Sequence, residues 1–430
     1  MMAPMQPLES WGRYPAARQA ALPVVWRDDP LPRVPGKLLP FGRGRSYGDC
    51  CLNDGGTLLV TERLDHFIHF DAASGLLRCE AGVQLADVLA LAVPRGFFLP
   101  VVPGTQFVSV GGAIANDIHG KNHFRAGTFG CHLRRLELLR SSGERIVCSP
   151  DENAQLFAAT IAGLGLTGLI LWAELQLRPI QGPFIDAETI PFRDLDEFLG
   201  IDAESAARFE YTVAWIDCHS RPTRGLYFRG DHSPRPGAFR ARGGSVALPF
   251  DLPAAAVGPL AVKAFNALYF AKGRLRAGRR QVRYGPFFFP LDAIGRWNRV
   301  YGHRGFLQFQ CVVPDRAAIR SVLQRIAGSG EGSSLAVLKT FGNLPSPGLL
   351  SFPRRGVTLS LDFPNHGQRT FALLDALEAL VRDSGGALYP AKDARMSPAS
   401  FAAGYPRAVE FERHVDPAFS SSFWRRVRPA

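Results

Sequence analysis

Two glycine-rich segments contain residue types suited to holding a phosphorylated ligand. The first reads Gly42-Arg-Gly-Arg-Ser-Tyr-Gly-Asp49. Closely spaced glycines let successive backbone N–H groups point into one concavity, which holds a diphosphate without side-chain charge. Arg43 and Arg45 add positive charge to this segment. Taken by itself, the segment is explained equally well by an ordinary glycine-rich turn.

The second segment, Val102 to Lys121, is more specific because its glycines and polar residues share one short span. That span contains Gly104, Gly111, Gly112, His119, Gly120 and Lys121 around a centre of small residues. Small residues are what the close approach of a flat cofactor requires. The alternatives are a histidine satisfied within the core and a lysine in a solvated loop.

A third glycine motif, Gly163-Leu-Gly-Leu-Thr-Gly168, matches the pattern G-x-G-x-x-G. The dinucleotide-binding fingerprint needs a strand before the glycines and a helix after them. Here the predicted helix comes first and the predicted strand follows. We therefore exclude a Rossmann site, although these glycines can still contact a nucleotide through their backbone.

Near the end of the sequence, Leu388-Tyr-Pro-Ala-Lys-Asp-Ala-Arg395 places Tyr389, Lys392 and Arg395 on one turn. A lysine in a partly desolvated pocket stabilises an anionic cofactor, or acts as a base once its pKa falls. A lysine on a surface loop fits this segment as well. The sequence shows no Ser-His-Asp order, H-E-x-x-H helix or Walker A motif, which disfavours hydrolases and kinases.

The composition sets broader limits. The chain has 430 residues, and 50 Lys and Arg against 38 Asp and Glu give a net charge of +12. This length predicts about two domains, and the charge favours an anionic partner: nucleic acid, a phosphorylated small molecule or an anionic membrane. The seven cysteines are scattered and form no C-x-x-C pair. They predict neither a disulfide framework nor a metal site, and they favour reduced thiols in the cytosol.

The chemistry-bearing segments alternate with short elements that must position them, which predicts an α+β fold. In the first part, strands are expected at 37–41, 57–61, 66–70, 76–80 and 168–178, and helices at 84–93 and 153–162. In the second part, strands are expected at 211–217, 306–313 and 357–363, and helices at 317–327 and 369–383.

The sequence predicts neither a signal peptide nor a membrane-spanning helix. Residues 1–18 lack an apolar h-region, and the apolar stretch 246–270 is interrupted by Asp251, Lys263 and three prolines. The segment 263–283 carries seven cations and no acid. We expect it to be a loop that contacts an anionic membrane through its cations and Phe265, Leu268, Tyr269 and Phe270, with a merely solvated loop as the alternative.

These segments, in the same order along nearly the whole chain, resemble the vanillyl-alcohol-oxidase type of FAD enzymes. Six further motifs resemble the decaprenylphosphoryl-β-D-ribose 2-oxidase family within it: Asp117-Ile-His-Gly-Lys-Asn122, Pro290-Leu-Asp292, Trp297-Asn-Arg299, Gly305-Phe-Leu-Gln-Phe-Gln310, Leu361-Asp-Phe-Pro364 and Ala391-Lys-Asp393. The resemblance implies a two-part FAD-binding domain of the PCMH type, formed by residues 1–182 and 387–430. A substrate (cap) domain of antiparallel sheet and helices, residues 183–386, is inserted between the two parts.

The resemblance also implies roles for individual residues. Cofactor contacts are expected from Arg43, Gly44, Arg45, Ser46, Tyr47, Gly104, Thr105, Gly111, Gly112, Asn116, His119, Gly120, Gly163, Gly168 and Tyr389. Substrate contacts are expected from Lys121, Trp215, Gln308, Gln310, Lys339, Ser360, Asp362 and Lys392. The implied catalytic residues are Lys392, His119 and Tyr47, and no metal is implied.

The sequence departs in three ways, at four positions, from patterns found in relatives. Ser360 stands where members captured covalently by nitroaromatic inhibitors have cysteine, and Asn116 also replaces a cysteine. Covalent capture is therefore not expected. Arg45 and Ser46 occupy the place of the histidine that links flavin covalently in other relatives. We therefore expect non-covalent FAD.

The implied reaction oxidises the C2 hydroxyl of a polyprenyl-phospho-β-D-ribose to the 2-keto sugar. An NAD(P)H-dependent short-chain reductase then completes an epimerisation to arabinose. The implied location is cytoplasmic, or peripheral at the inner face of the membrane. The alternative within the enzyme class is an alditol or aldonolactone oxidase acting on a soluble sugar. Nucleic-acid binding is disfavoured, because the cationic segment has few interleaved aromatic residues.

Overall fold

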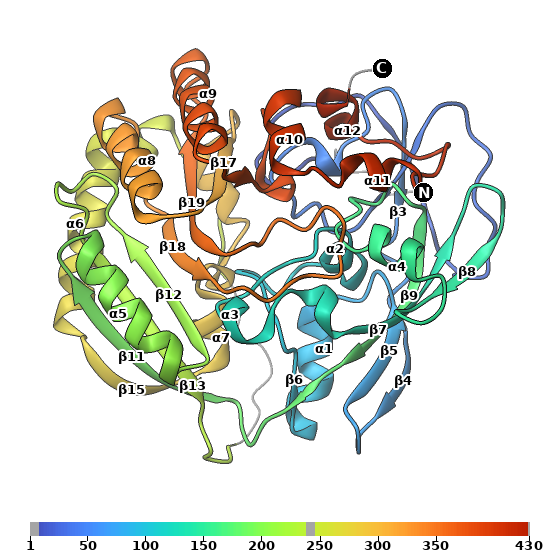
Figure 1. Cartoon of the computed structure of the whole chain (residues 1–430), viewed down its shortest axis with the longest axis horizontal. Coiled ribbons are helices and arrows are strands. Elements are labelled where there is room, and N and C mark those ends of the chain that lie inside the picture. The colour runs from blue at the N-terminus through green and yellow to red at the C-terminus, as the bar shows by residue number, and fades with distance from the viewer. Residues whose placement is uncertain (1–7, 238–245, 429–430) are drawn as a thin grey trace.

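The computed structural model describes residues 8–237 and 246–428. Residues 1–7, 238–245 and 429–430 lie outside the described residues, and so do the parts of the expected domains that fall there. Figure 1 shows a large sheet with helices against it at the left, and smaller sheets at the right, with the red helices of the chain end beside the blue N-terminal part.

The smaller sheets come mostly from the first 180 residues. A parallel three-stranded sheet has the order β1 (Ala20–Pro23), β3 (Thr57–Val60), β2 (Leu38–Phe41). An antiparallel five-stranded sheet has the order β4 (Phe67–Asp71), β5 (Leu76–Glu80), β9 (Leu169–Gln176), β7 (Leu133–Leu139), β8 (Arg145–Cys148). The short strands β6 (Phe97–Phe98) and β10 (Arg178–Pro179) pair with each other. The accompanying helices are α1 (Leu85–Ala92), α2 (Val110–Ala115), α3 (His123–Ala126) and α4 (Ala154–Thr160).

The large sheet has eight strands, and every pairing in it is antiparallel. Its order is β15 (Gly278–Arg283), β11 (Phe184–Phe192), β13 (Gly225–His232), β12 (Tyr211–Ile216), β18 (Ala336–Phe341), β19 (Gly356–Pro364), β17 (Phe306–Val313), β20 (Ala387–Leu388). Its helices are α5 (Leu195–Arg208), α6 (Pro259–Leu275), α7 (Tyr284–Phe288), α8 (Arg316–Ser329) and α9 (Gln368–Asp383). The pair β14 (Val246–Ala247) and β16 (Ile294–Gly295) lies outside this sheet.

Alternation along the central strands divides this sheet into two chemically different faces. On β19, Leu359 and Leu361 are buried in the core cluster that includes residues of α8 and α9, whereas Ser360 and Asp362 line a cavity on the other face. Successive side chains of a strand point to opposite faces. The apolar residues therefore pack against the helices, while the polar residues face the cavity. On β17, Gln308 lies on the cavity side in the same way.

The last segment of the chain returns to the first. After β20 come α10 (Pro398–Gly404), α11 (Ala408–Glu412) and α12 (Ser422–Val427), which Figure 1 shows in red beside the blue N-terminal part. Leu38 forms a parallel bridge with Phe419, and its backbone N–H donates to Ala418 O at 2.8 Å. The two ends of the described chain therefore form one packed unit.

The prediction of a cationic loop at 263–283 is wrong. Most of the segment 263–283 belongs to α6 and to the edge strand β15. α6 begins at Pro259, which is favourable in the first helical turn, and its many Ala and Leu residues favour helix. Sequence reasoning took exposed charge as a sign of a loop, although an exposed helix and an edge strand carry charge equally well. Among the described residues, no helix is both long and apolar enough to cross a membrane.

Candidate active site

One cavity of about 670 Å³ brings together most of the sequence-predicted site residues. Its lining comes from both glycine segments, from the polar face of the eight-stranded sheet and from the turn around Lys392. Of the predicted residues, Gly163 is absent from the lining. A Cβ at Gly163 would lie 2.2 Å from the carbonyl oxygen of Ala159, so local packing accounts for this glycine.

The first glycine segment is held against the Lys392 turn. A Cβ at Gly48 would overlap the carbonyl group of Asp393, so only glycine allows this approach. The backbone N–H of Tyr47 donates to Ala391 O at 2.9 Å. The Lys392 Nζ atom lies 3.8 Å from the centroid of the Tyr47 ring. Two predicted catalytic residues, about 345 positions apart, are thereby in contact.

The second glycine segment presents His119 from a turn fixed by a buried carboxylate. Asp117 has φ +40° and is fully buried. Its carboxylate accepts hydrogen bonds from the Ser346 and Ser351 hydroxyls, both at 2.5 Å, and from Gly130 N–H at 2.9 Å. Both serines come from the connection between β18 and β19. This buried network therefore ties the His119 turn to the eight-stranded sheet.

His119 sits between two side chains of that sheet. The His119 Nε2 atom lies 3.0 Å from Gln310 Nε2, and its Nδ1 atom lies 3.2 Å from Lys339 Nζ. Burial, followed by the charge of Lys339, holds the pKa of His119 well below its ordinary value. The ring is therefore neutral at physiological pH. With the Lys339 amine donating to Nδ1, the imidazole proton is on Nε2 and points to the Gln310 side-chain amide, whose oxygen can turn to accept it.

Three half-buried lysines and one buried carboxylate set the charge of the cavity. Burial lowers the pKa of Lys121 to about 8, and the Lys121 ammonium donates to Phe288 O at 3.0 Å. Burial and the two other lysines lower the pKa of Lys339 to about 7. Burial also lowers the pKa of Lys392 and raises that of Asp362, and the attraction between these two opposes both shifts. The excess of cations suits an anionic ligand.

Comparisons of the chain with known proteins show the family to which it belongs. Residues 34–149 match the family model described as "FAD binding domain". The chain is 37% identical over 417 residues to "Decaprenylphosphoryl-beta-D-ribose oxidase" of Mycolicibacterium smegmatis, covering 91% of this chain and 89% of that protein. The chain belongs to the decaprenylphosphoryl-β-D-ribose oxidase family. It is an FAD-dependent oxidoreductase with an FAD-binding domain of the PCMH type.

Two other relatives match a smaller share of the chain. An "Uncharacterized protein in mprA 5'region" of Streptomyces coelicolor is 34% identical over 80% of this chain and 100% of its own length. "Cytokinin dehydrogenase 10" of Oryza sativa is 28% identical over 45% of this chain and 37% of its own length. The match to the oxidase family thus extends well beyond the part shared with the cytokinin enzyme.

The residues present fit the FAD that this family uses. The Nε atoms of Arg43 and Arg45 are buried beside the cavity and have no hydrogen-bond partner within the described chain. The Arg45 guanidinium also lies 4.0 Å from the centroid of the Trp11 ring. A buried donor without an acceptor is costly, and the oxygens of a diphosphate are acceptors of the missing kind. Space beyond Gly104 is open, because a Cβ there would meet no atom within 4 Å.

The three departures from family patterns also lie at this cavity. Ser360 and Asn116 line it, as do Arg45 and Ser46 in the first glycine segment. The Asn116 side-chain amide donates to Gly112 O at 2.9 Å, and the Asn116 backbone carbonyl accepts from the Tyr389 hydroxyl at 2.7 Å. The serine hydroxyl at position 360 is not the nucleophilic thiol that captured family members carry.

Several residues that build or line the site were not expected from the sequence. Asp117 was named only within a motif, because its serine partners are more than 200 positions away and no spacing rule links them. Cys50 lines the cavity, and burial raises the pKa of its thiol to about 12. Phe265 and Tyr269 were expected at a membrane, and they line the outer part of this cavity. Their four-residue spacing on an amphipathic helix is the signal that would have grouped them.

Proposed function

We propose that this chain oxidises the C2 hydroxyl of a polyprenyl-phospho-β-D-ribose to the 2-keto sugar. The observation that carries the proposal is the composition of the cavity. Three half-buried lysines lie in the same cavity as the FAD-type glycine segments, and the cavity continues to aromatic residues on an exposed helix. A phosphate suits the cations, and an apolar chain suits the aromatic end. The name and coverage of the Mycolicibacterium relative support the same substrate class.

We assign cofactor binding and substrate binding to two different domains of the molecule. Residues 1–182 and 387–430 form the FAD-binding domain, and residues 183–386 form the inserted substrate domain. The bridge between Leu38 and Phe419 supports the joining of the first and last segments. Substrate contacts then come from the polar face of the large sheet, through Gln308, Gln310, Ser360 and Asp362 with Trp215 beside them.

The cofactor contacts belong to the same proposal. Arg43 to Tyr47, Gly104, Thr105, Gly111, Gly112, Asn116, Gly120, Gly168 and Tyr389 hold FAD. When bound, FAD accepts the hydride. No covalent bond to FAD is expected, because Arg45 and Ser46 replace the linking histidine and the raised pKa of Cys50 leaves its thiol protonated. Acid precipitation should therefore release yellow flavin into the supernatant, and a yellow pellet would contradict this.

Each catalytic residue has a role set by its charge. Lys392 stays cationic and stabilises negative charge that develops on the reduced cofactor, while the Tyr47 ring holds its ammonium in place. Lys339, with its lowered pKa, accepts the proton of the C2 hydroxyl. The neutral His119 accepts a hydrogen bond from the Lys339 amine at its Nδ1 atom, which leaves the lone pair of that amine for the proton of the C2 hydroxyl. Lys121 binds the substrate phosphate.

The outer surface of α6 is the proposed contact with an anionic membrane (Figure 1). Leu260, Leu268 and Leu275 are between 72% and 85% exposed and, with the alanines between them, occupy one arc of the helix. Lys263 and Arg274 border this arc on one side and Lys272 on the other. Such a surface suits a layer of acyl chains beneath anionic headgroups.

The proposal also names a partner and a location. A 2-keto sugar becomes arabinose only when a hydride is added to the opposite face of C2. An NAD(P)H-dependent short-chain reductase is the expected second enzyme. Both enzymes would meet the lipid at the inner face of the membrane, with the cytoplasm supplying NAD(P)H.

Anaerobic flavin bleaching tests the proposed function. The holoenzyme is mixed with a panel of prenyl-phospho-pentoses and, separately, with free alditols and aldonolactones. We expect rapid bleaching with the prenyl-phospho-ribose and none with the free sugars. Bleaching by a free alditol but not by the lipid-linked ribose would contradict the proposal and favour a soluble-sugar oxidase.

A further inference from the structure

A series of aromatic rings leads from inside the cavity to the surface. The Trp215 and Tyr269 ring centroids lie 4.7 Å apart, and Tyr269 stacks on Phe265 at 5.9 Å with an interplanar angle of 17°. All three side chains line the cavity. Their exposed fractions rise outward, from 7% at Trp215 to 38% at Tyr269 and 46% at Phe265. The rings therefore form a continuous apolar path between the interior and solvent.

The inner end of this path is fixed by the sheet. The Trp215 indole N–H donates to Ser334 O at 3.0 Å, which sets the plane of the ring. The same strand and two others contribute small or apolar side chains to the same lining, from Val213 on β12, Ala187 on β11 and Phe228 on β13. Thr189 and Arg280 lie beside these residues in the lining. An apolar chain packed against the rest of the wall would remove water from both apolar surfaces, which favours its binding.

The outer end is fixed by a buried polar anchor on α6. The Asn266 amide is fully buried and donates to Asp217 Oδ1 at 3.1 Å and to Ser333 O at 3.3 Å. This anchor sets the rotation of the helix. Phe265 and Tyr269 lie one turn apart, so the same rotation turns both rings toward the cavity. The path is thus held in place by the fold.

We infer that Trp215, Tyr269 and Phe265 form a subsite for the isoprenoid units next to the substrate phosphate. This subsite rests on the proposed function, in which the phosphosugar occupies the inner cavity near the lysines. A polyprenyl chain must then leave the cavity, and the aromatic path leads toward the exposed apolar arc of α6. Flat aromatic faces pack well against the methyl-branched units of an isoprenoid.

Binding of sugar-free ligands to the holoenzyme tests this subsite separately from catalysis. Farnesyl phosphate and ethyl phosphate share a phosphate and differ in the apolar chain. Their affinities are measured by calorimetry for the parent, for the double variant Phe265→Ala/Tyr269→Ala, and for the control Phe67→Ala. Phe67 is a similarly exposed phenylalanine, 40% accessible, outside the cavity lining. All three substituted side chains are partly exposed, so folding is retained.

The parent should bind farnesyl phosphate at least roughly tenfold more tightly than ethyl phosphate, since two partly buried aromatic contacts are worth about that much. The double variant should lose this preference, with ethyl phosphate binding unchanged, and Phe67→Ala should match the parent. A preference retained by the double variant, or absent from the parent, would overturn the subsite. If the preference follows this pattern but prenyl-phospho-ribose fails to bleach the flavin, the subsite stands and the proposed reaction falls.

Discussion

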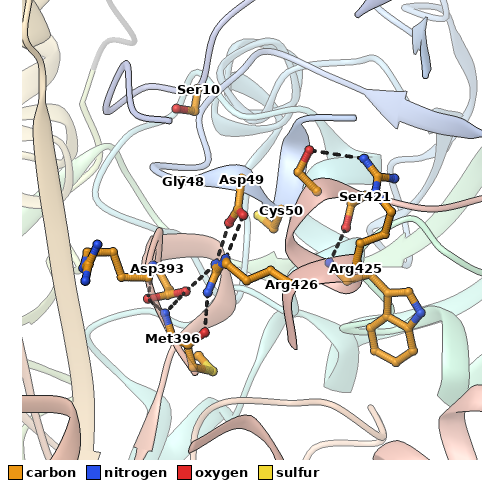
Figure 2. Close-up of polar contacts among 12 residues, drawn as sticks. Ser10, Gly48, Asp49, Cys50, Asp393, Met396, Ser421, Arg425 and Arg426 are labelled. Carbon is orange, nitrogen blue, oxygen red and sulfur yellow. Dashed lines mark hydrogen bonds and ion pairs between the residues drawn. The ribbon is translucent and has the colours of Figure 1, made fainter. Parts of the chain in front are cut away.

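Arg426 donates two hydrogen bonds to the carboxylate of Asp49, at 2.9 Å from Nε and 2.7 Å from Nη2, across 377 positions of sequence (Figure 2). The same guanidinium donates to Asp393 at 2.9 Å. Asp49 ends the first glycine segment, and Asp393 directly follows Lys392. A single arginine thus joins the proposed diphosphate loop to the turn that carries the proposed catalytic lysine.

Arg426→Met should destabilise the fold, because it leaves two largely buried carboxylates without their cation. The free energy of unfolding should fall by about 3 kcal/mol, toward the lower end for breaking a buried pair since Arg426 is partly exposed. Urea denaturation measures this. As a control, Arg407→Met removes an exposed pair with Glu410 and should cost less than about 1 kcal/mol. Equal losses of unfolding free energy in the two variants would contradict the role assigned to Arg426. In the double variant Arg426→Met/Asp49→Asn, the carboxylate left unpaired is removed, so stability should partly recover. No recovery would also contradict that role.

Lys392→Met should impair chemistry more than folding. The substitution removes the ammonium and keeps most of the apolar stem. Anaerobic stopped-flow absorbance should show flavin reduction slowed roughly a hundredfold or more, the range for losing one preorganised charged group. FAD content should remain normal. Lys37→Met, at an exposed lysine outside the cavity lining, serves as the control. An unchanged reduction rate in the Lys392 variant would return this residue to an ordinary structural role.

The pH dependence of kcat/KM should follow the titration of the Lys339 amine. Burial lowers its pKa to about 7, and only the neutral amine accepts a proton, so kcat/KM should rise with pH through about 7. Above this range, loss of the Lys392 proton should lower the rate again. Lys339→Arg keeps the charge but cannot deprotonate, so its profile should be slow and lack the rising limb. A rising limb that survives this substitution would rule out Lys339 as the proton acceptor.

Binding to anionic liposomes should depend on the outer arc of α6. Leu268→Asp/Leu275→Asp should abolish co-sedimentation, and Lys272→Gln/Arg274→Gln should weaken it by about 1 kcal/mol for each cation lost. Binding by the parent should decline as salt screens the charges. Val409→Asp, on an exposed site of α11, is the control. Undiminished binding by the leucine variant would contradict this surface. Arg279 and Arg280 are left intact, because Arg279 pairs with Glu188 and Arg280 lines the cavity.

The parts of the site that were predictable from the sequence rest on local patterns. The strand predicted at 357–363 alternates apolar and polar residues, and alternation alone puts Ser360 and Asp362 on the face opposite Leu361. The glycine segments were also visible, because close backbone approach requires small residues at short spacing. Their assignment to FAD needed the family resemblance, since glycine-rich turns without ligands have similar sequences.

The parts that were missed depend on long-range contacts. No local rule pairs Asp117 with Ser346 and Ser351, or Asp49 with Arg426. The strand β20 has only two residues, too few to show a period. The cations of 263–283 predict a loop, whereas the structure forms α6 there with an apolar arc that faces solvent, which reverses the pattern expected of a helix on a soluble domain. Departures of this kind from the usual hydrophobic pattern are expected at functional surfaces, and the apolar arc of α6 is one such departure.

The position of a deuterium isotope effect tests the central claim most directly. The holoenzyme is mixed anaerobically with prenyl-phospho-β-D-ribose carrying deuterium at C1, C2 or C3 of the ribose, and flavin reduction is followed by stopped flow. Removal of hydride from C2 predicts that only the C2-deuterated substrate is reduced markedly more slowly than the unlabelled one. A primary isotope effect at C1 or C3, or no flavin reduction by any of these substrates, would contradict the proposed reaction.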